Sequence, residues 1–258
     1  MIITGKLLKE NKACETWVRK WEACFPRGLK VSKKNLERVL YSGFGPVIEQ
    51  WKTKLNITLT YEGLNLRYAD LRESNFSLAN LDNVDLHEAK LGGSRLFKAS
   101  LRNADLTSVH LYEAELYGAN LEGAKLRYSY LAKANLHRAN MKEASITYAN
   151  LHRANMPRAD LRNADLRNTD LRLSDLRGAD LRSSDLNNAD LRQANLDNAD
   201  LKGANLVNAD LKGASLVNAD LHKAFLRNAD LEGAIIPDNG RFEDGRWINN
   251  DRIPNDLL

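Results

Sequence analysis

The 258-residue chain has few cysteines and no long apolar run. Cys14 and Cys24 lie in one stretch with helical periodicity, where a rise of about 1.5 Å per residue separates them by roughly 15 Å. That separation is too long for a disulfide, so we expect two buried thiols in a reducing compartment. The chain also lacks the roughly 18 consecutive apolar residues of a membrane helix and the apolar core of a secretory signal. We therefore expect a cytoplasmic protein with no membrane partner.

The sequence also lacks any group of residues arranged for catalysis, metal binding or cofactor binding. Its five histidines are scattered, and none belongs to a metal-spaced or triad-like motif. Its glycines form no phosphate-binding cluster, and its aspartates recur at regular intervals instead of clustering. We expect a protein that is not an enzyme and that holds no cofactor.

What the sequence has in abundance is one short repeat. From Leu66 to Ile236 every fifth residue is large and apolar, which makes 35 consecutive units. The residue two positions earlier is small or slim, and it is alanine in 26 units, with Leu64 as the exception in size. A period of five does not fit a helix, where successive leucines would be rotated by about 140°, nor a long strand. Both apolar positions can face one interior only if the chain turns a corner in every unit, so the pattern predicts a solenoid.

Runs such as Ala159-Asp160-Leu161-Arg162-Asn163 resemble the pentapeptide repeat family. The resemblance covers residues 61–236 and implies a mainly β fold, a right-handed quadrilateral β-helix with four units per coil. Residues twenty apart in the sequence would then stack on one face. The units would make about nine coils, and the roughly 4.8 Å spacing of neighbouring strands would give a rod about 42 Å long. Small residues at alternate inward positions leave room for the leucines in such a narrow interior.

The two ends of the chain differ from the repeat, and all four tryptophans lie in them. We expect an α-helical N-terminal cap over 1–58, the β-helix over 59–236, and a distorted final coil with a tail over 237–258. Phe242 and Trp247 are again five apart, which favours the distorted coil. Solenoids need caps because unpaired backbone groups at their ends recruit other chains. The resemblance leaves open a monomer or a homodimer formed through the C-terminal end.

Charged residues of the repeat are predicted to form stripes along the rod. Stacking at twenty aligns Asp160, Asp180 and Asp200 on one face, with Arg162 and Arg182 beside them. Arg172 and Arg192 align in the same way on the opposite face. The simplest expectation is that neighbouring acidic and basic stripes pair across the coils, each exposed pair contributing less than about 1 kcal/mol.

The net charge of +4 is distributed unevenly, with +7 in residues 1–60, −1 in 61–236 and −2 in 237–258. Some proteins of the resembled family mimic a DNA duplex with acidic stripes and bind type II topoisomerases. A duplex as long as the rod would carry about 25 negative charges. Residues 61–236 contain 23 basic and 24 acidic side chains. We therefore disfavour DNA gyrase as the partner.

Aromatic side chains form a second predicted surface feature. Phe97, Tyr117 and His137 are twenty apart and should stack outward on one face. Tyr128 and Tyr148 should stack on another face, with Tyr112 and Tyr130 nearby. Exposed aromatic residues are enriched in protein interfaces. The alternative is that they only stabilise the rod by packing between coils.

We therefore predict a non-enzymatic protein–protein interaction scaffold or regulator, bacterial and more narrowly cyanobacterial, whose partner is another protein. The candidate partner-binding residues are Phe97, Tyr112, Tyr117, Tyr128, His137, Tyr148, Asp160, Arg162, Arg172, Asp180, Arg182, Arg192 and Asp200. One alternative is a DNA-mimicking modulator of DNA gyrase or topoisomerase. Another is nucleic-acid binding through the basic N-terminal helices, which we also disfavour because a cap needs a solvated charged face.

Overall fold

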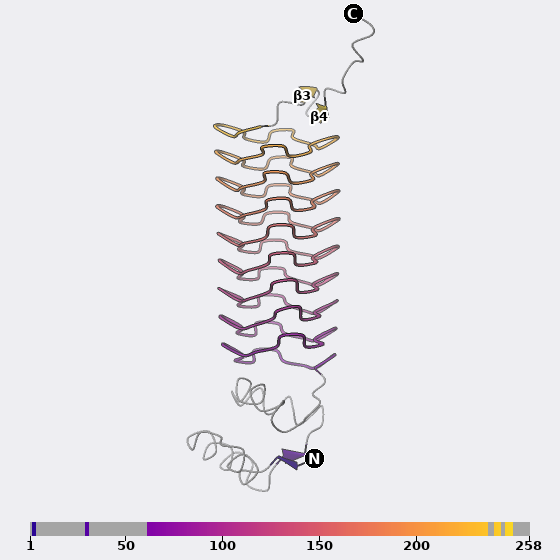
Figure 1. Cartoon of the computed structure of the whole chain (residues 1–258), viewed down its shortest axis with the longest axis vertical. Coiled ribbons are helices and arrows are strands. Elements are labelled where there is room, and N and C mark those ends of the chain that lie inside the picture. Colours follow the sequence, from indigo (N-terminus) through magenta and orange to yellow (C-terminus); the bar gives the residue numbers. More distant parts are fainter. Residues whose placement is uncertain (1, 4–28, 31–60, 237–239, 244–245, 250–258) are drawn as a thin grey trace, which may run out of the picture.

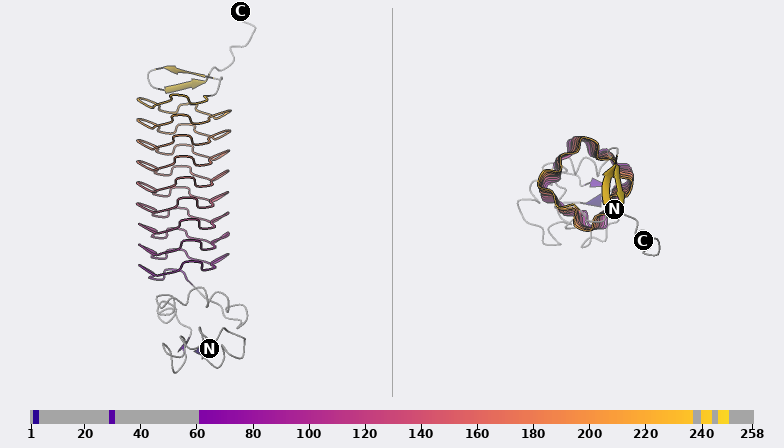
Figure 2. Two further views of the ribbon diagram at one scale, coloured as in Figure 1. Left: turned by 90° about the vertical axis from the view of Figure 1, so that its left-hand side faces the viewer. Right: turned by 90° about the horizontal axis from the view of Figure 1, so that it is seen from above.

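The computed structural model describes residues 2–3, 29–30, 61–236, 240–243 and 246–249. Residues 61–236 wind into a rod of stacked coils (Figure 1). Every fifth residue from Asn65 to Ser215 forms a parallel β-bridge with the residue twenty positions later. Seen along its axis, the rod has four sides and its coils lie over one another (Figure 2). The predicted solenoid with four units per coil is therefore confirmed.

Each unit of the repeat has five positions with fixed roles, which we name with the unit Ala159 to Asn163 as the example. Ala159 occupies the small position, Asp160 the ladder position and Leu161 the central position, while Arg162 and Asn163 occupy the first and second turn positions. The small and central positions point inward and are almost completely buried in nearly every unit. At the N-terminal end of the rod, the rings of Tyr61 and Phe76 fill the interior with an edge-to-face contact, their centroids 5.4 Å apart.

The coils are held together by backbone hydrogen bonds that recur in every regular unit. Asp160 N–H donates to the carbonyl of Ala139 on the preceding coil at 2.9 Å, and Leu161 N–H donates to the carbonyl of Asp180 on the following coil at 2.7 Å. Asn163 N–H also reaches the following coil. Ala164 N–H closes the corner by donating to the carbonyl of Leu161 at 3.1 Å.

The N–H of the first turn position has no backbone partner, and where the ladder position is an aspartate or an asparagine its side chain supplies the acceptor. Arg162 N–H donates to Oδ1 of Asp160 at 3.2 Å. The same bond recurs along the rod wherever the ladder residue is an aspartate or an asparagine and the residue two positions later has an N–H group. This explains why those two residues dominate the ladder position, because a short side chain with an oxygen at Oδ1 completes the turn.

The second turn position has a left-handed backbone in every unit of the rod. Asn163 has a φ of 57° and Leu173 a φ of 59°, and the glycines at this position, such as Gly178, have the same sign. Glycine and asparagine tolerate this conformation best. The geometry therefore accounts for their frequency at the second turn position.

The four strands with labels lie outside the coils. β1 (Ile2–Ile3) pairs antiparallel with β2 (Leu29–Lys30). β3 (Gly240–Glu243) pairs antiparallel with β4 (Arg246–Asn249) in a hairpin that follows the last coil (Figure 2). The α-helices predicted within 1–58 lie outside the described residues, so the N-terminal cap stays a prediction.

The C-terminal hairpin differs from the distorted coil predicted over 237–258. Phe242 and Trp247 are cross-strand partners in an antiparallel pair. In a coil, residues five apart would instead occupy equivalent positions of consecutive sides. The repeat of small and central positions ends at Ile236, so the spacing of five between Phe242 and Trp247 no longer places them on consecutive sides of a coil. In the hairpin, the same spacing places them opposite each other on two strands.

Candidate functional site

Phe97, Tyr117 and His137 form one continuous column of stacked rings, which we call the aromatic column. Their ring centroids are 5.4 and 5.2 Å apart, and each pair of ring planes is within 10° of parallel. All three occupy the first turn position on one side of the rod, so the bridges between coils set their spacing. The predicted stacking is confirmed. Phe97 is exposed, and the other two rings are half-buried.

Cationic side chains border the aromatic column. Lys98 Nζ lies 5.2 Å from the centroid of the Phe97 ring, and Arg138 donates a hydrogen bond of 3.4 Å to Oη of Tyr117. Beyond His137, a shallow hollow of about 570 Å³ is lined by His137, Arg138, Asn155, Pro157, Arg158 and Arg177. Within the described rod, Lys98, Arg138 and Arg158 form no ion pair with a carboxylate. The column therefore combines exposed ring surface with unneutralised positive charge.

The other predicted aromatic residues lie half a coil away from the aromatic column or on a neighbouring side. Tyr128 and Tyr148 stack with centroids 5.3 Å apart, as predicted, and the guanidinium of Arg127 lies over both rings at 4.8 and 5.7 Å. Tyr130 stacks on His110 at 4.7 Å, a pair that the sequence reasoning missed although the two residues are twenty apart.

Tyr112 is not part of a ring stack in the described rod. Its Oη accepts a hydrogen bond of 2.7 Å from Lys133 on the following coil, and the same ammonium group lies 3.1 Å from Oε1 of Glu113. Both acceptors raise the pKa of Lys133, with the Tyr112 hydroxyl as the larger cause. Tyr112 is therefore held by an ammonium bridge between coils.

The charged stripes form two neutralised ladders on opposite sides of the rod. In the first, Arg162 donates from Nε to Oδ1 of Asp160 at 2.8 Å and also lies 3.5 Å from Oδ2 of Asp180 on the following coil. Further along this ladder the contacts are Arg182 with Asp180 and Asp200, and Lys202 with Asp200 and Asp220.

The second ladder repeats this geometry half a coil away. Arg172 donates from Nε to Oδ1 of Asp170 at 2.8 Å and lies 3.4 Å from Oδ2 of Asp190. Arg192 continues the series with Asp190 and Asp210. The hydrogen bond from Arg172 is the main cause that lowers the pKa of Asp170, and Arg162 acts on Asp160 in the same way. The predicted pairing of stripes across coils is confirmed, so the acidic ladders present little unbalanced charge.

Where serine occupies the ladder position, a carboxylate from the preceding coil can replace the missing acceptor. Asp82 Oδ1 accepts hydrogen bonds from the hydroxyl of Ser100 and, at 2.9 Å, from Arg102 N–H. Asp197 does the same for Ser215 and Val217 N–H, the latter at 3.0 Å. The sequence carries the signal for this arrangement, since each aspartate precedes its serine by eighteen residues.

Two features are missing from the part of the chain that the structure describes. No three histidine, cysteine, aspartate or glutamate side chains come together as metal ligands. No helix there has the length and apolar character needed to cross a bilayer.

Known proteins share the repeat described above. The family of pentapeptide repeats matches residues 62–96, 91–127, 119–157, 158–193 and 194–233. Among curated proteins, none matches this chain.

Solved structures of similar proteins include two from cyanobacteria. HetL from Nostoc, a pentapeptide repeat protein involved in the regulation of heterocyst differentiation, is 33% identical over 74% of this chain and 96% of its own, with a TM-score of 0.37. Rfr23 from Cyanothece is 30% identical over 47% of this chain and 90% of its own, with a TM-score of 0.25. QnrB1, a plasmid-mediated fluoroquinolone resistance protein, is 17% identical over 71% of this chain and 87% of its own, with a TM-score of 0.33.

The repeat match extends over most of the chain and coincides with the coils of the rod. Proteins of this kind fold as right-handed β-helices. The chain therefore belongs to the pentapeptide repeat family.

Proposed function

We propose that the protein is a non-enzymatic interaction rod that binds another protein through the aromatic column. The observation that carries the proposal is the stack of Phe97, Tyr117 and His137 on an exposed side of the rod, bordered by cations without carboxylate partners. Aromatic residues and arginine are the residue types most enriched at the centres of protein interfaces. A partner that fits this surface offers an apolar or aromatic segment flanked by acidic residues.

The charged ladders are less suited to this role. Their aspartates are already bound by arginine or lysine on the same coil and on the preceding one. A partner that used them would first have to break these ion pairs. The same pairing weighs against DNA mimicry, which needs unbalanced negative charge along the rod. That alternative is tested by gyrase supercoiling assays with micromolar protein, in which we expect no effect.

Affinity purification from the source organism tests the proposal. The full-length protein should retain a partner that is lost from the double variant Phe97→Ser with Tyr117→Ser. Val217→Ser is the matched control, because Val217 is an exposed apolar residue at the same repeat position on the same side of the rod, four coils beyond His137. Retention of the same partner by all three proteins would contradict the proposal.

Measuring thermal unfolding of the same variants separates binding from packing. Stacked aromatic pairs contribute roughly 0.5–1.5 kcal/mol each, so the double variant should lose some stability but stay folded. Arg138→Glu provides a second test that leaves every ring in place. It should weaken binding of an acidic partner while the thermal midpoint stays close to that of the unaltered protein. If the stack serves only for packing, stability falls and the partner is kept.

A further inference from the structure

Two regularities of the rod draw attention to a position at which a carboxylate is missing and the arginine beside it has no other carboxylate partner. First, an aspartate or asparagine at the ladder position accepts the N–H of the residue two positions later, as Asp165 does for Arg167 at 3.2 Å. Second, an arginine at the first turn position lies close to the carboxylate eighteen residues later. Arg162 is 3.5 Å from Asp180, and Arg167 is 3.7 Å from Asp185. One carboxylate at the ladder position therefore serves two donors.

Ser145 occupies a ladder position where both donors are present and the carboxylate is not. Arg127 precedes Ser145 by eighteen residues, and Thr147 N–H follows two residues later. Within the described rod, Arg127 pairs with no carboxylate and donates only to Oη of Tyr128, at 2.9 Å. Thr147 N–H and the hydroxyls of Ser145 and Thr147 likewise find no acceptor among the described residues.

The rod itself shows what a serine at this position binds. At Ser100 and Ser215 the serine hydroxyl and the neighbouring N–H both donate to one carboxylate oxygen, supplied by Asp82 and Asp197. These aspartates precede their serines by eighteen residues. The residue eighteen positions before Ser145 is instead Arg127. The same pair of donors is therefore combined with a guanidinium in place of the internal carboxylate.

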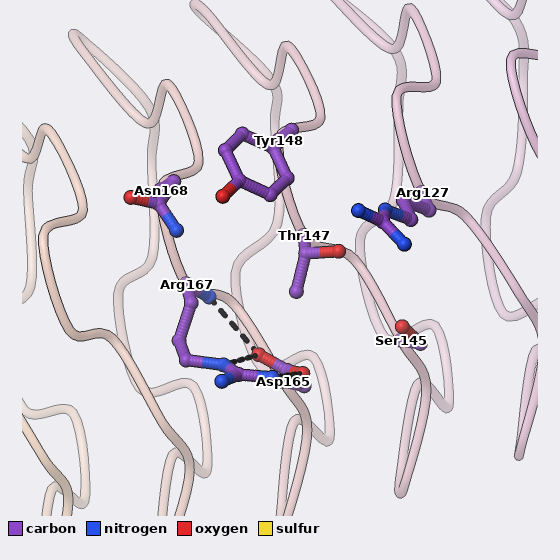
Figure 3. Close-up of a pocket in the computed structure, with 7 residues that line it drawn as sticks. All are labelled: Arg127, Ser145, Thr147, Tyr148, Asp165, Arg167 and Asn168. Atoms are coloured by element: carbon purple, nitrogen blue, oxygen red, sulfur yellow. Dashed lines mark hydrogen bonds and ion pairs between the residues drawn. The ribbon is translucent and has the colours of Figure 1, made fainter.

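Side chains around Ser145 enclose a hollow of about 300 Å³, which we call the serine hollow (Figure 3). Its lining residues are Arg127, Ser145, Thr147, Tyr148, Asp165, Arg167 and Asn168. Figure 3 shows Thr147 between Arg127 on one neighbouring coil and Arg167 on the other. Thr147 is a buried residue with a short side chain, and it lines the hollow together with the two arginines.

The charge of the serine hollow suits one anionic group. Arg167 is held by Asp165, to which it donates from Nε at 2.8 Å and from Nη2 at 2.7 Å. Arg127 forms no ion pair or hydrogen bond with a carboxylate among the described residues, although its charge contributes at longer range to lowering the pKa of Asp165. The lining therefore carries one positive charge in excess. A guanidinium, two hydroxyls and a backbone N–H are all hydrogen-bond donors, as an oxyanion requires.

We propose that the serine hollow is a binding site for a single carboxylate, which completes the ladder between Arg127 and Thr147 from outside. The internal carboxylates at Ser100 and Ser215 favour this group over a tetrahedral anion. The site lies half a coil away from the aromatic column and does not require the partner proposed for it. A protein side chain and a free organic acid carry the same group, and the experiment distinguishes these two sources.

The experiment follows backbone amide signals of the full-length protein by NMR while acetate or blocked aspartate, N-acetyl-aspartate methylamide, is added. The Thr147 amide should shift and saturate, with a Kd on the order of 1–10 mM for a few charge-assisted hydrogen bonds. The amides of Arg102 and Val217 are internal controls and should not shift in this way, because Asp82 and Asp197 already bind them. Tighter binding of blocked aspartate than of acetate would indicate a protein-borne carboxylate, and the reverse a free organic acid.

Two variants complete the test. Ser145→Asp supplies the carboxylate internally, so it should abolish the shift at Thr147 and raise the thermal midpoint. Arg127→Met should weaken binding at least tenfold without unfolding the rod. The proposal is overturned if Thr147 shows no saturating shift, or if Ser145→Asp binds acetate as the unaltered protein does. It is also overturned if inorganic phosphate saturates the site while neither carboxylate does.

Discussion

Asp170 and Arg172 are joined by two kinds of hydrogen bond. Oδ1 of Asp170 accepts the backbone N–H of Arg172 at 3.1 Å and its guanidinium Nε at 2.8 Å. One side chain thus completes the turn and neutralises the cation beside it. The bond from the backbone N–H needs only an oxygen acceptor, since Asn150 on the same side of the rod accepts the N–H of His152 in the same way. The bond from the guanidinium depends on the negative charge of the carboxylate.

This division predicts a specific dependence on pH. Arg172 lowers the pKa of Asp170 in the folded protein. The stabilisation by this pair is therefore fully present above the ordinary carboxylate pKa of about 3.9 and is lost as the pH falls through the lower folded value. Asp170→Asn keeps the turn and removes the charge. Thermal unfolding between pH 7 and pH 2 should show the variant slightly less stable at neutral pH and equal to the unaltered protein in strong acid. A difference that does not change with pH would contradict this reading.

Asp82 and Ser100 form a unit whose parts can be exchanged. Asp82→Ala leaves Arg102 N–H and the Ser100 hydroxyl without their acceptor, so we expect a loss of about 1–2 kcal/mol in urea unfolding. Ser100→Asn restores an acceptor at the ladder position. The double variant should therefore recover much of the loss. If Ser100→Asn does not reduce the cost of Asp82→Ala, the proposed role of the ladder position is wrong.

The left-handed turn position offers a stabilising substitution. Leu173 has a φ of 59° and is exposed, so Leu173→Gly removes backbone strain with little loss of packing. We expect a gain of up to about 1 kcal/mol, reduced by the greater chain entropy of glycine. Gly178→Ala is the converse on the next corner and should lower stability. Its cost comes from the positive φ, because an added Cβ would lie 3.7 Å from Cγ of Arg158, which is an ordinary van der Waals distance.

The narrow interior predicts a strong contrast between inward and outward positions. Ala179→Leu places three extra carbon atoms in a filled core, which should cost roughly 1–3 kcal/mol or more. Arg177→Leu removes an exposed ion pair with Asp175 and should cost less than about 1 kcal/mol. Urea unfolding of both variants checks this order. Equal costs would mean that the interior can expand.

Much of the rod could be predicted because one unbroken period fixes the place of every residue in it. The stacking of Phe97 on Tyr117 and the approach of Arg162 to Asp180 both follow from a spacing of twenty residues per coil. The hairpin of β3 and β4 could not be predicted in this way, because the repeat has ended there and five-residue spacing no longer specifies one structure.

Other features carried a signal whose meaning depends on the geometry of the turn. Asparagine or glycine occupies 17 of the 35 second turn positions. This frequency indicates a left-handed backbone once it is known that the chain turns a corner between successive leucines. The serine hollow is harder to recognise. Ser145 and Ser100 share the ladder position but have Arg127 and Asp82, respectively, eighteen residues earlier, and that distance has meaning only when the contacts between coils are known.

The aromatic column is tested most directly by photo-crosslinking in the source organism. A photoreactive phenylalanine analogue replaces Phe97 in one protein and Val217 in another. We predict a crosslinked partner protein from position 97 that is lost when Arg138→Glu is added, and no such product from position 217. A partner crosslinked equally from both positions, or from position 217 alone, would contradict the claim that the aromatic column is the binding surface.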